Sequence, residues 1–263
     1  MTRLGILGAV LTVLWLWPAP APAGVAADED GIWLDIFGCK IWVKDKRATI
    51  DTQWEGTCRL GKASATGSFT RKYKDADARI VVETYTGHWI EGRQQGQGRY
   101  ENTLGVLYDG GFRDGLPDGE GTYRWSDGTR YSGGWKAGLR VGRGTYHWAN
   151  GASYQGQWVA DRRSGWGVYL GAKGDSYEGE FLDGKFDGRG IMNWAEGPRF
   201  EGAFKDGRPD GKGRLFVTSG DEVHGEFRGD KLIGAGRCWR ANVDRWFDCA
   251  QDGARIKNVK SLK

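Results

Sequence analysis

The chain repeats itself every 23 residues over most of its length, and this period constrains its fold more than any other feature. The third and the fourteenth residues of each repeat are glycine, as are Gly110 and Gly121 in the repeat that begins at Tyr108. The eight repeats begin at Trp54, Tyr85, Tyr108, Tyr131, Tyr154, Tyr177, Phe200 and Val223. Because each unit of such an array contacts mainly its neighbours, the molecule is expected to be elongated rather than globular.

Each repeat has the sequence pattern of a β-hairpin. Rings and glycines alternate with polar residues in two stretches, for example at 108–112 and 119–125. Alternation with a period of two is typical of strands and places the rings and glycines on one face of a sheet. Turn-forming pairs such as Asp114-Gly115 separate the two stretches. We therefore predict an all-β fold, a single elongated sheet of about eight hairpins in which glycines leave slots for rings from neighbouring strands.

Composition and motifs exclude several classes of protein. Aromatic residues make up 13% of the chain, including 14 tryptophans, which is incompatible with a disordered chain. The formal net charge of +4 is too small to indicate a nucleic-acid partner. The sequence has no phosphate-binding loop, nucleophile elbow or zincin motif, and no cysteine or histidine pair has zinc spacing. We predict that the protein is not an enzyme and has no cofactor, metal or nucleic-acid partner.

The first residues have the pattern of an export signal. Arg3 precedes an uncharged run at 4–17 and a stretch of small residues with Ala-x-Ala at Ala21 and Ala23. The run is shorter than the ~20 apolar residues that span a membrane. We predict a signal peptide at 1–23, with cleavage at 27 as the alternative, and hence a periplasmic or secreted protein. The remaining segments are an N-terminal cap at 24–53, the array at 54–245, and a C-terminal cap strand with a basic tail at 246–263.

The repeat pattern resembles the MORN repeat (membrane occupation and recognition nexus). The match is best at 108–130, 131–153 and 177–199 and extends over 54–245. The resemblance implies an all-β array of hairpins with scaffolding or binding roles, attached in some members to membranes or to a separate enzymatic domain. Cys39 and Cys58 further resemble the cysteine pair that flanks the first repeat in exported members of bacterial type.

Four cysteines lie at the two ends of the array. Cys58 takes position 5 of the first repeat and Cys238 position 16 of the last, where interior repeats have rings. Cys249 follows Cys238 after eleven residues, so that a turn near 242–245 would bring these two cysteines opposite each other. Disulfides persist in exported proteins. We predict the disulfides Cys39–Cys58 and Cys238–Cys249, one at each end.

The candidate binding residues form two groups. Rings at position 5 are expected to stack as the core of the sheet, and the alternative is that they stay open as a platform for a polymer. These rings are Trp89, Phe112, Trp135, Trp158, Phe181 and Phe204. Basic side chains assigned to the opposite face could contact an anionic surface. They include Arg140, Arg143, Arg162, Arg163, Lys185, Arg189 and Lys212.

The function predicted from these features is that of an exported, non-catalytic scaffold or binding protein. Its partner would be a protein or an anionic envelope surface, either lipid or glycan. The alternative function is binding of a glycan or cell-wall polymer through an exposed aromatic ladder. The unpaired edges at the two ends of the sheet could also mediate self-association.

Overall fold

The structure is a computed structural model that describes residues 31–229 and 231–251. The predicted signal peptide and the basic tail beyond residue 251 lie outside these ranges. The strands are β1 (Ile32–Ile36), β2 (Cys39–Val43), β3 (Thr49–Arg59), β4 (Lys62–Lys74), β5 (Ile80–Ile90), β6 (Arg93–Asn102), β7 (Leu107–Arg113), β8 (Leu116–Arg124), β9 (Arg130–Lys136), β10 (Leu139–His147), β11 (Ser153–Val159), β12 (Arg162–Leu170), β13 (Ser176–Leu182), β14 (Lys185–Asn193), β15 (Arg199–Lys205), β16 (Arg208–Phe216), β17 (Glu222–Arg228), β18 (Lys231–Arg240) and β19 (Arg245–Gln251).

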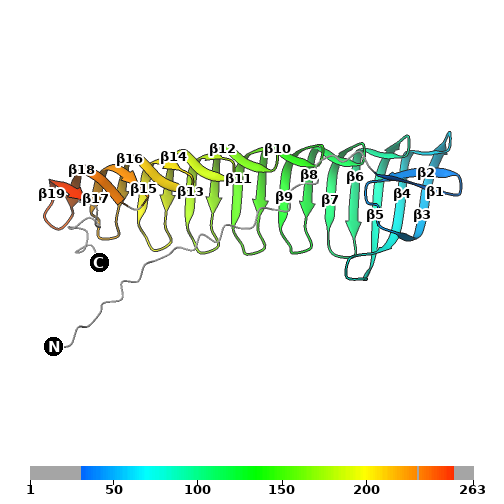
Figure 1. Cartoon of the computed structure of the whole chain (residues 1–263), viewed down its shortest axis with the longest axis horizontal. Coiled ribbons are helices and arrows are strands. Elements are labelled where there is room, and N and C mark those ends of the chain that lie inside the picture. The colour runs from blue at the N-terminus through cyan, green and yellow to red at the C-terminus, as the bar shows by residue number, and fades with distance from the viewer. Residues whose placement is uncertain (1–30, 230, 252–263) are drawn as a thin grey trace, which may run out of the picture.

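The nineteen strands of the described part form one open sheet, which confirms the predicted all-β array. Strands β3 to β18 make eight hairpins that pair antiparallel with their neighbours in chain order and follow one another along the long axis of the molecule (Figure 1). Strand β19 pairs with β18 at one end. The described residues contain no helix of the length and apolar character that crossing a membrane requires.

The tip of each hairpin folds over the ring-bearing face, which the sequence did not predict. The glycine at position 12 of seven repeats, such as Gly119 and Gly142, has φ between 62° and 106°, and the strand register shifts beside it. This β-bulge bends the hairpin, and the tips lie along one long edge of the sheet (Figure 1). Neighbouring tips are joined through the backbone, as when the Gly115 N–H donates to the Gln94 carbonyl (3.1 Å) and Gly138 N–H to the Pro117 carbonyl (2.8 Å). The tips therefore form a second layer above the sheet.

The paired glycines at positions 3 and 14 form slots for rings, as predicted, but each ring comes from the same hairpin. Tyr108 at position 1 lies over Gly110 and Gly121, where an added Cβ would come within 2.8 Å and 2.3 Å of its hydroxyl oxygen. The Tyr108 hydroxyl donates to the Gly111 carbonyl (2.8 Å), and the tyrosines that open the neighbouring repeats make the same bond. Each repeat thus places one ring between sheet and tip.

A continuous spine of edge-to-face rings runs between the sheet and the tips. The Tyr108 ring centroid lies 4.9 Å from that of Phe112 in its own repeat and 5.7 Å from that of Trp135 in the next. The same contacts recur from Tyr85 to Phe227, and all of these rings are buried. Since ring pairs of this geometry add to the energy of burial, the spine is the core that holds successive hairpins together.

The C-terminal end has the predicted disulfide. Cys238 of β18 and Cys249 of β19 are bonded, with Cα atoms 5.8 Å apart. Their register differs from the prediction, because Cys249 lies opposite Gly236 and Cys238 lies opposite Phe247. The bond is therefore diagonal across the two strands. It ties the last strand, which has only one neighbour, to the array.

The N-terminal end has a hairpin cap, and here the disulfide prediction requires correction. Strands β1 and β2 lie against the first tips, where the Lys40 N–H donates to the Gly61 carbonyl (2.8 Å). Cys39 and Cys58 are free thiols, not a disulfide. The Cys58 thiol contacts the Gly38 carbonyl (3.9 Å) and hydrogen-bonds with the Cys39 thiol. Contacts between the cap backbone and the tips hold this end without a covalent bond.

The two N-terminal thiols are expected to differ strongly in reactivity. Burial raises the pKa of Cys39 to about 12, and the neighbouring Cys58 adds to the shift, so the Cys39 thiol stays protonated at neutral pH. Cys58 is exposed. An alkylating reagent should therefore modify Cys58 well before Cys39 in the native protein, as followed by peptide mass mapping. Equal rates at the two cysteines, or no modification of either, would contradict this arrangement.

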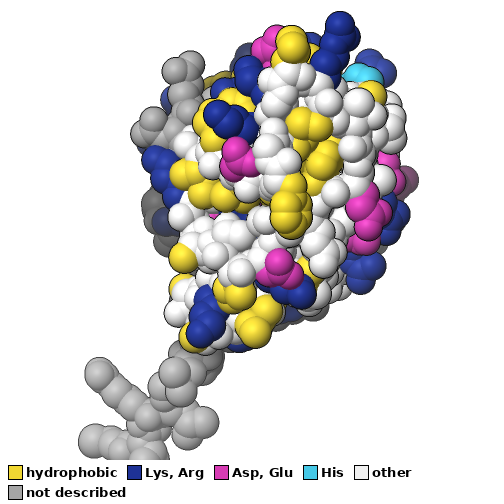
Figure 2. All heavy atoms as spheres, turned by 90° about the vertical axis from the view of Figure 1, so that its right-hand side faces the viewer, with side chains coloured by type: hydrophobic (Ala, Val, Ile, Leu, Met, Phe, Trp, Pro, Cys, Tyr) yellow, Lys and Arg dark blue, Asp and Glu magenta, His cyan; other side chains and the backbone are white. Residues whose placement is uncertain are grey.

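Two large apolar residues occupy unfavourable backbone positions at the N-terminal end. Phe37 and Leu60 stand at adjacent turn tips with φ of 52° and 51° and are 105% and 95% exposed. Figure 2, which faces this end, shows hydrophobic side chains among basic and acidic ones on the surface. Other tips have aspartate with the same φ, as at Asp114 and Asp183.

Replacing Phe37 and Leu60 by asparagine is expected to stabilise the fold. Left-handed backbone conformations cost most L-residues about 1–2 kcal/mol, and asparagine less, while no packing is lost at a fully exposed site. Each substitution should raise the free energy of unfolding by about 0.5–1 kcal/mol, as measured by urea denaturation. The substitution Ile90→Asn, which removes an exposed apolar side chain without positive φ, is the control and should bring no such gain. A loss of stability at both tips would show that these side chains support the fold.

Candidate binding trough

A cavity of about 790 Å³ lies between the sheet and the folded-over tips, over hairpins β3/β4 to β9/β10. We call it the trough. Tip residues form one wall of the trough, and aromatic rings form its floor. The loop at 43–47 closes its N-terminal end. The residues that line it include Asp45, Arg47, Phe69, Glu83, Tyr85, Tyr100, Tyr108, Phe112, Leu116, Pro117, Tyr123, Trp125, Trp135, Arg140 and Asp161.

The floor carries a second row of rings, from positions 16 and 18 of the repeats. Tyr123 and Trp125 are partly exposed, and their ring centroids lie 4.5 Å apart. Beyond the residues that line the trough, the row continues through Tyr146 to Trp148, with centroid distances of 5.5 Å and 4.7 Å between successive rings. Tyr123, Trp125 and Trp148 are partly exposed and offer apolar surface to a ligand, whereas Tyr146 between Trp125 and Trp148 is buried.

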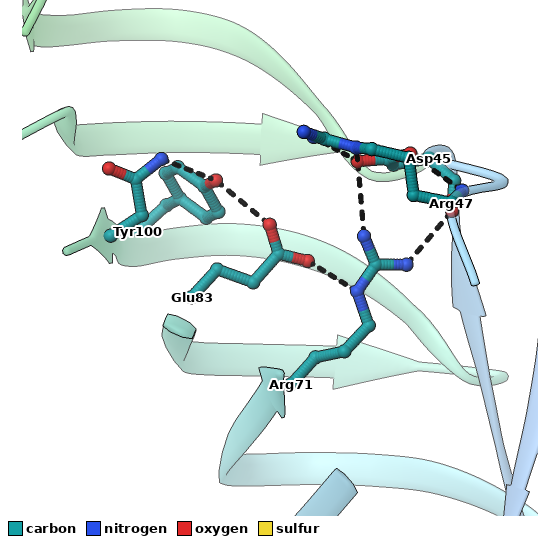
Figure 3. Close-up of polar contacts among 6 residues, drawn as sticks. Asp45, Arg47, Arg71, Glu83 and Tyr100 are labelled. Atoms are coloured by element: carbon teal, nitrogen blue, oxygen red, sulfur yellow. Dashed lines mark hydrogen bonds and ion pairs between the residues drawn. The ribbon is translucent and has the colours of Figure 1, made fainter. Parts of the chain in front are cut away.

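A buried ionic network closes the N-terminal end of the trough (Figure 3). Arg71 on β4 is fully buried, at position 18, where three other repeats have tryptophan. Its Nε lies 2.9 Å from Glu83 Oε1, its Nη2 3.1 Å from Asp45 Oδ2, and its Nη1 donates to the Asp45 carbonyl (2.9 Å). Arg47 pairs with Asp45, and Tyr100 donates its hydroxyl proton to Glu83 Oε2 (3.0 Å). The network ties the loop to β4, β5 and β6.

The two carboxylates of the network have opposite pKa shifts. Burial raises the pKa of Glu83, and the Arg71 charge offsets only part of this rise. Burial also acts to raise the pKa of Asp45, but hydrogen bonds from Arg47 and the charges of Arg47 and Arg71 outweigh it and lower the pKa. Both oxygens of Glu83 are engaged, one by Arg71 and one by Tyr100. This is the arrangement of a counterion that compensates a buried arginine.

The position-5 rings predicted as candidate ligand contacts are buried in the structure. Their exposed fractions are 0% for Trp89, 7% for Phe112, 6% for Trp135, 4% for Trp158, 3% for Phe181 and 4% for Phe204. They form the spine, as the first of the two interpretations expected. The folded-over tips cover them, so an open aromatic ladder at position 5 is wrong for these residues.

The predicted basic residues do not share one face. Arg143, Arg189 and Lys212 are exposed at position 13, on the face opposite the trough. Arg162 and Lys185 lie on the tips and pair with aspartates of the next tip, Arg162 with Asp183 at 2.9 Å and Lys185 with Asp206 at 2.6 Å.

Arg140 and Arg163 lie among the rings of the inner face, which corrects their assignment to the opposite face. Arg140 is 3% exposed and its Nε lies 2.7 Å from Asp161 Oδ1. The fold-over of the tips brings position 10 above the rings, so neither arginine belongs to an exposed basic surface.

The opposite face has a wide, shallow groove over β15 to β19. Its lining carries both signs of charge, with Glu201 and Asp248 beside Arg214 and Arg237. Among the described residues, no three or more His, Cys, Asp or Glu side chains are placed to hold a metal ion. The trough therefore has the more distinctive chemistry, because it combines apolar rings with buried arginines.

The sequence pattern placed the rings of positions 16 and 18 on the ring-bearing face but did not single them out as binding residues, and it did not indicate the Arg71 network. Both leave a signal in the sequence. Tyr123 and Trp125 lie two residues apart at the end of the second strand, and Arg71 takes position 18, where three other repeats have tryptophan. The burial of this charge distinguishes the N-terminal end of the trough.

Comparison with known protein families finds the MORN repeat at residues 85–102, 108–130, 131–153, 154–176, 177–199 and 200–221. These six copies cover half of the chain and coincide with the hairpins β5/β6 to β15/β16. The hairpins β3/β4 and β17/β18 have the same fold but lie outside the matches. A search of curated proteins found no match to the chain. By its repeat unit and by the hairpin that each unit forms, the chain belongs to the MORN-repeat family.

Proposed function

We propose that the protein is a non-catalytic, exported scaffold that binds a segment of a protein partner in the trough. MORN repeats are associated with binding or scaffold roles, and the array occupies most of the described chain. The ionisable groups in the trough support this proposal, because Asp45, Glu83 and Asp161 are each already paired with an arginine.

The observation that carries the proposal is the row of rings that begins on the floor of the trough and continues beyond it. Its partly exposed members Tyr123, Trp125 and Trp148 lie in sequence along the array. The buried Tyr146 packs between Trp125 and Trp148. Hairpins follow one another every two strands, or ~10 Å, so the row matches a polymer with repeated apolar side chains better than a small molecule. A polypeptide segment supplies such side chains and also donors and acceptors for the polar wall.

The test is binding of short random-sequence peptides, displayed on an array, to the purified protein and two variants. The double variant Trp125→Ala and Trp148→Ala removes one ring from the trough and one from the ring row just beyond it. Trp166→Ala is the matched control, because Trp166 is 51% exposed on the opposite face. We expect the trough variant to lose about tenfold or more in affinity for the bound peptides and the control to lose none. Binding that depends on Trp166, or binding of anionic lipid vesicles in place of peptides, would contradict the proposal.

Export is proposed on the sequence of the first residues. Arg3, the uncharged run at 4–17 and the Ala-x-Ala motif have the pattern of a cleaved signal peptide. Expression with the native N-terminus should therefore give a mature protein that begins at residue 24 or 28 outside the cytoplasm. N-terminal sequencing of the fractionated protein tests this, and an intact N-terminus in the cytoplasm would contradict it.

A further inference from the structure

Arg140 and Arg163 occupy position 10 of consecutive repeats and make the same contacts with rings. The Arg140 guanidinium carbon lies 4.5 Å from the ring centroid of Trp158 and 5.1 Å from that of Tyr146. Arg163 lies 5.4 Å from the centroid of Phe181 and 5.8 Å from that of Tyr169. Arg163 also lies 5.7 Å from the centroid of Trp148, which continues the ring row beyond the trough. It is therefore placed one repeat beyond Arg140 along the inner face.

The two arginines differ in the residue that the next tip places beside them. The residue at position 8 of the following repeat lies next to each arginine. It is Asp161 beside Arg140 and Gly184 beside Arg163. Arg140 donates from Nε to Asp161 Oδ1 (2.7 Å) and from Nη2 to the Asp161 carbonyl (3.2 Å). Arg163 donates from Nη2 to the Gly184 carbonyl alone. Within residues 31–229 and 231–251, no carboxylate lies at ion-pair distance from Arg163.

This leaves a cation among aromatic rings without a compensating anion. Burial lowers the pKa of Arg163, and the neighbouring Tyr154 and Tyr169 offset only part of this effect. The guanidinium nevertheless stays charged at neutral pH and has four further N–H donors to offer. Buried charges are normally paired, and removing one partner of such a pair is strongly unfavourable. Arg163 therefore has both the charge and the free donors to bind an anion.

We propose that Arg163 binds a carboxylate of the partner segment where this segment extends beyond the trough along the inner face, while apolar side chains beside that carboxylate pack on Trp148 and Tyr169. This inference rests on the proposed function. The carboxylate belongs to an aspartate or glutamate side chain or to the C-terminus of the partner, since a guanidinium binds either one through two parallel hydrogen bonds. Partly exposed rings next to the cation favour an acidic residue that is followed or preceded by an apolar one.

The protein can be given its own carboxylate at this place by the substitution Gly184→Asp. An added Cβ at Gly184 meets no atom within 4 Å, and its φ of +83° is close to the 68° of Asp161. Gly207→Asp is the matched control, because Gly207 has φ of 85° but follows Phe186, not an arginine, at position 10. We expect Gly184→Asp to raise Tm by about 2–4 °C relative to Gly207→Asp, since only the first gains a charge partner. Equal Tm values would overturn the proposal.

The ligand itself is tested on arrays of random-sequence peptides with free or amidated C-termini. Arg163→Met removes the cation, and Gly184→Asp supplies a carboxylate that occupies the N–H donors of Arg163. Arg189→Met is the control, because Arg189 is exposed on the opposite face. We expect bound peptides to be enriched in Asp and Glu, and both inner-face variants to lose about tenfold or more in affinity while the control loses none. Loss confined to free C-termini would identify a terminal carboxylate as the anchor.

The two proposals fail in different ways in this experiment. If peptides bind without acidic enrichment and Arg163→Met has no effect, the role of Arg163 is overturned and the trough remains a peptide-binding site. If no peptide binds the wild-type protein, the proposed function is overturned, and the inference about its carboxylate anchor with it.

Discussion

Replacing Gly144 by alanine is expected to cost on the order of 3 kcal/mol of stability, although it adds a single methyl group. Gly144 is the position-14 glycine of its repeat, and an added Cβ would lie 2.3 Å from the Tyr131 hydroxyl oxygen and 2.5 Å from two of its ring carbons. The ring would have to leave its slot. It would then lose its hydrogen bond to the Gly134 carbonyl (3.1 Å) and its contacts with Trp135 and Trp158 in the spine.

A substitution at a second glycine of the same strand distinguishes the steric clash with the ring from the cost of a strained backbone. Gly142 has φ of +67° with no atom within 4 Å of an added Cβ. Gly142→Ala should therefore cost only the about 1–2 kcal/mol of a left-handed residue. Urea denaturation of both variants gives the comparison. A larger loss for Gly142→Ala than for Gly144→Ala would show that the slot does not limit side-chain size.

A double-mutant cycle identifies the ring as the cause. When Tyr131 is already alanine, the methyl group at position 144 meets no ring, so the further cost of Gly144→Ala should fall to a small fraction of its value in the wild-type protein. The coupling energy of residues in direct contact is typically 0.5–3 kcal/mol, and a value near the upper end is expected here. Additive losses in the cycle would place the effect of Gly144→Ala elsewhere.

The repeat period predicted the hairpins, their order and the glycine slots because these features depend on local spacing. Every repeat has glycines at positions 3 and 14, as at Gly110 and Gly121. The two-residue alternation around them was therefore enough to assign the strands and the ring-bearing face. The turn pairs, such as Asp114-Gly115, set the hairpin boundaries for the same reason.

The folded-over tips could not be predicted in this way, because the glycine at position 12 fits the alternation and conceals a bulge. In the sequence, Gly119 fits the two-residue alternation of a strand. In the structure, its φ of 103° lies where the strand bends. This bend covers Phe112 and brings Arg140 onto the inner face. Contacts between tips depend on tertiary packing, for which the sequence period carries no information.

The Arg71 network was missed for a different reason. Arg71, Glu83 and Asp45 come from three segments that only the folded loop at 43–47 brings together. Single charged residues at irregular positions are normally solvated, so nothing in the sequence marks these three for burial. Only the burial of Arg71 shows that its charge must be compensated within the fold.

The protein is expected to unfold steeply at alkaline pH because its core tyrosines must stay protonated. Five position-1 tyrosines are at most 1% exposed and donate hydrogen bonds to main-chain carbonyls: Tyr85, Tyr108, Tyr131, Tyr154 and Tyr177. Burial raises the pKa of Tyr154 to about 12, and it raises the pKa of the other four as well. In the unfolded chain the tyrosine pKa is about 10.

The sign of this shift fixes the pH range of the effect. Since folding favours the protonated phenol, the contribution of each tyrosine is complete below pH ~10 and is lost as pH rises toward its pKa in the folded state. Each tyrosine then removes about 1.4 kcal/mol per pH unit, so five remove about 7 kcal/mol per unit. Domains are typically stable by about 5–15 kcal/mol. Unfolding is therefore expected within about one to two units above pH 10.

Parallel titrations of tyrosinate absorbance and far-ultraviolet circular dichroism test this expectation. Both signals should change together in one steep transition, because the phenols become accessible only when the sheet opens. Phe200 shows that the slot accepts a ring without a hydroxyl. The variant with Tyr131→Phe and Tyr154→Phe should therefore fold and lose about 2.8 kcal/mol per pH unit less than the wild type, which moves its transition to higher pH. Tyrosines that titrate near pH 10 while the sheet signal persists would mean that the spine is open to solvent.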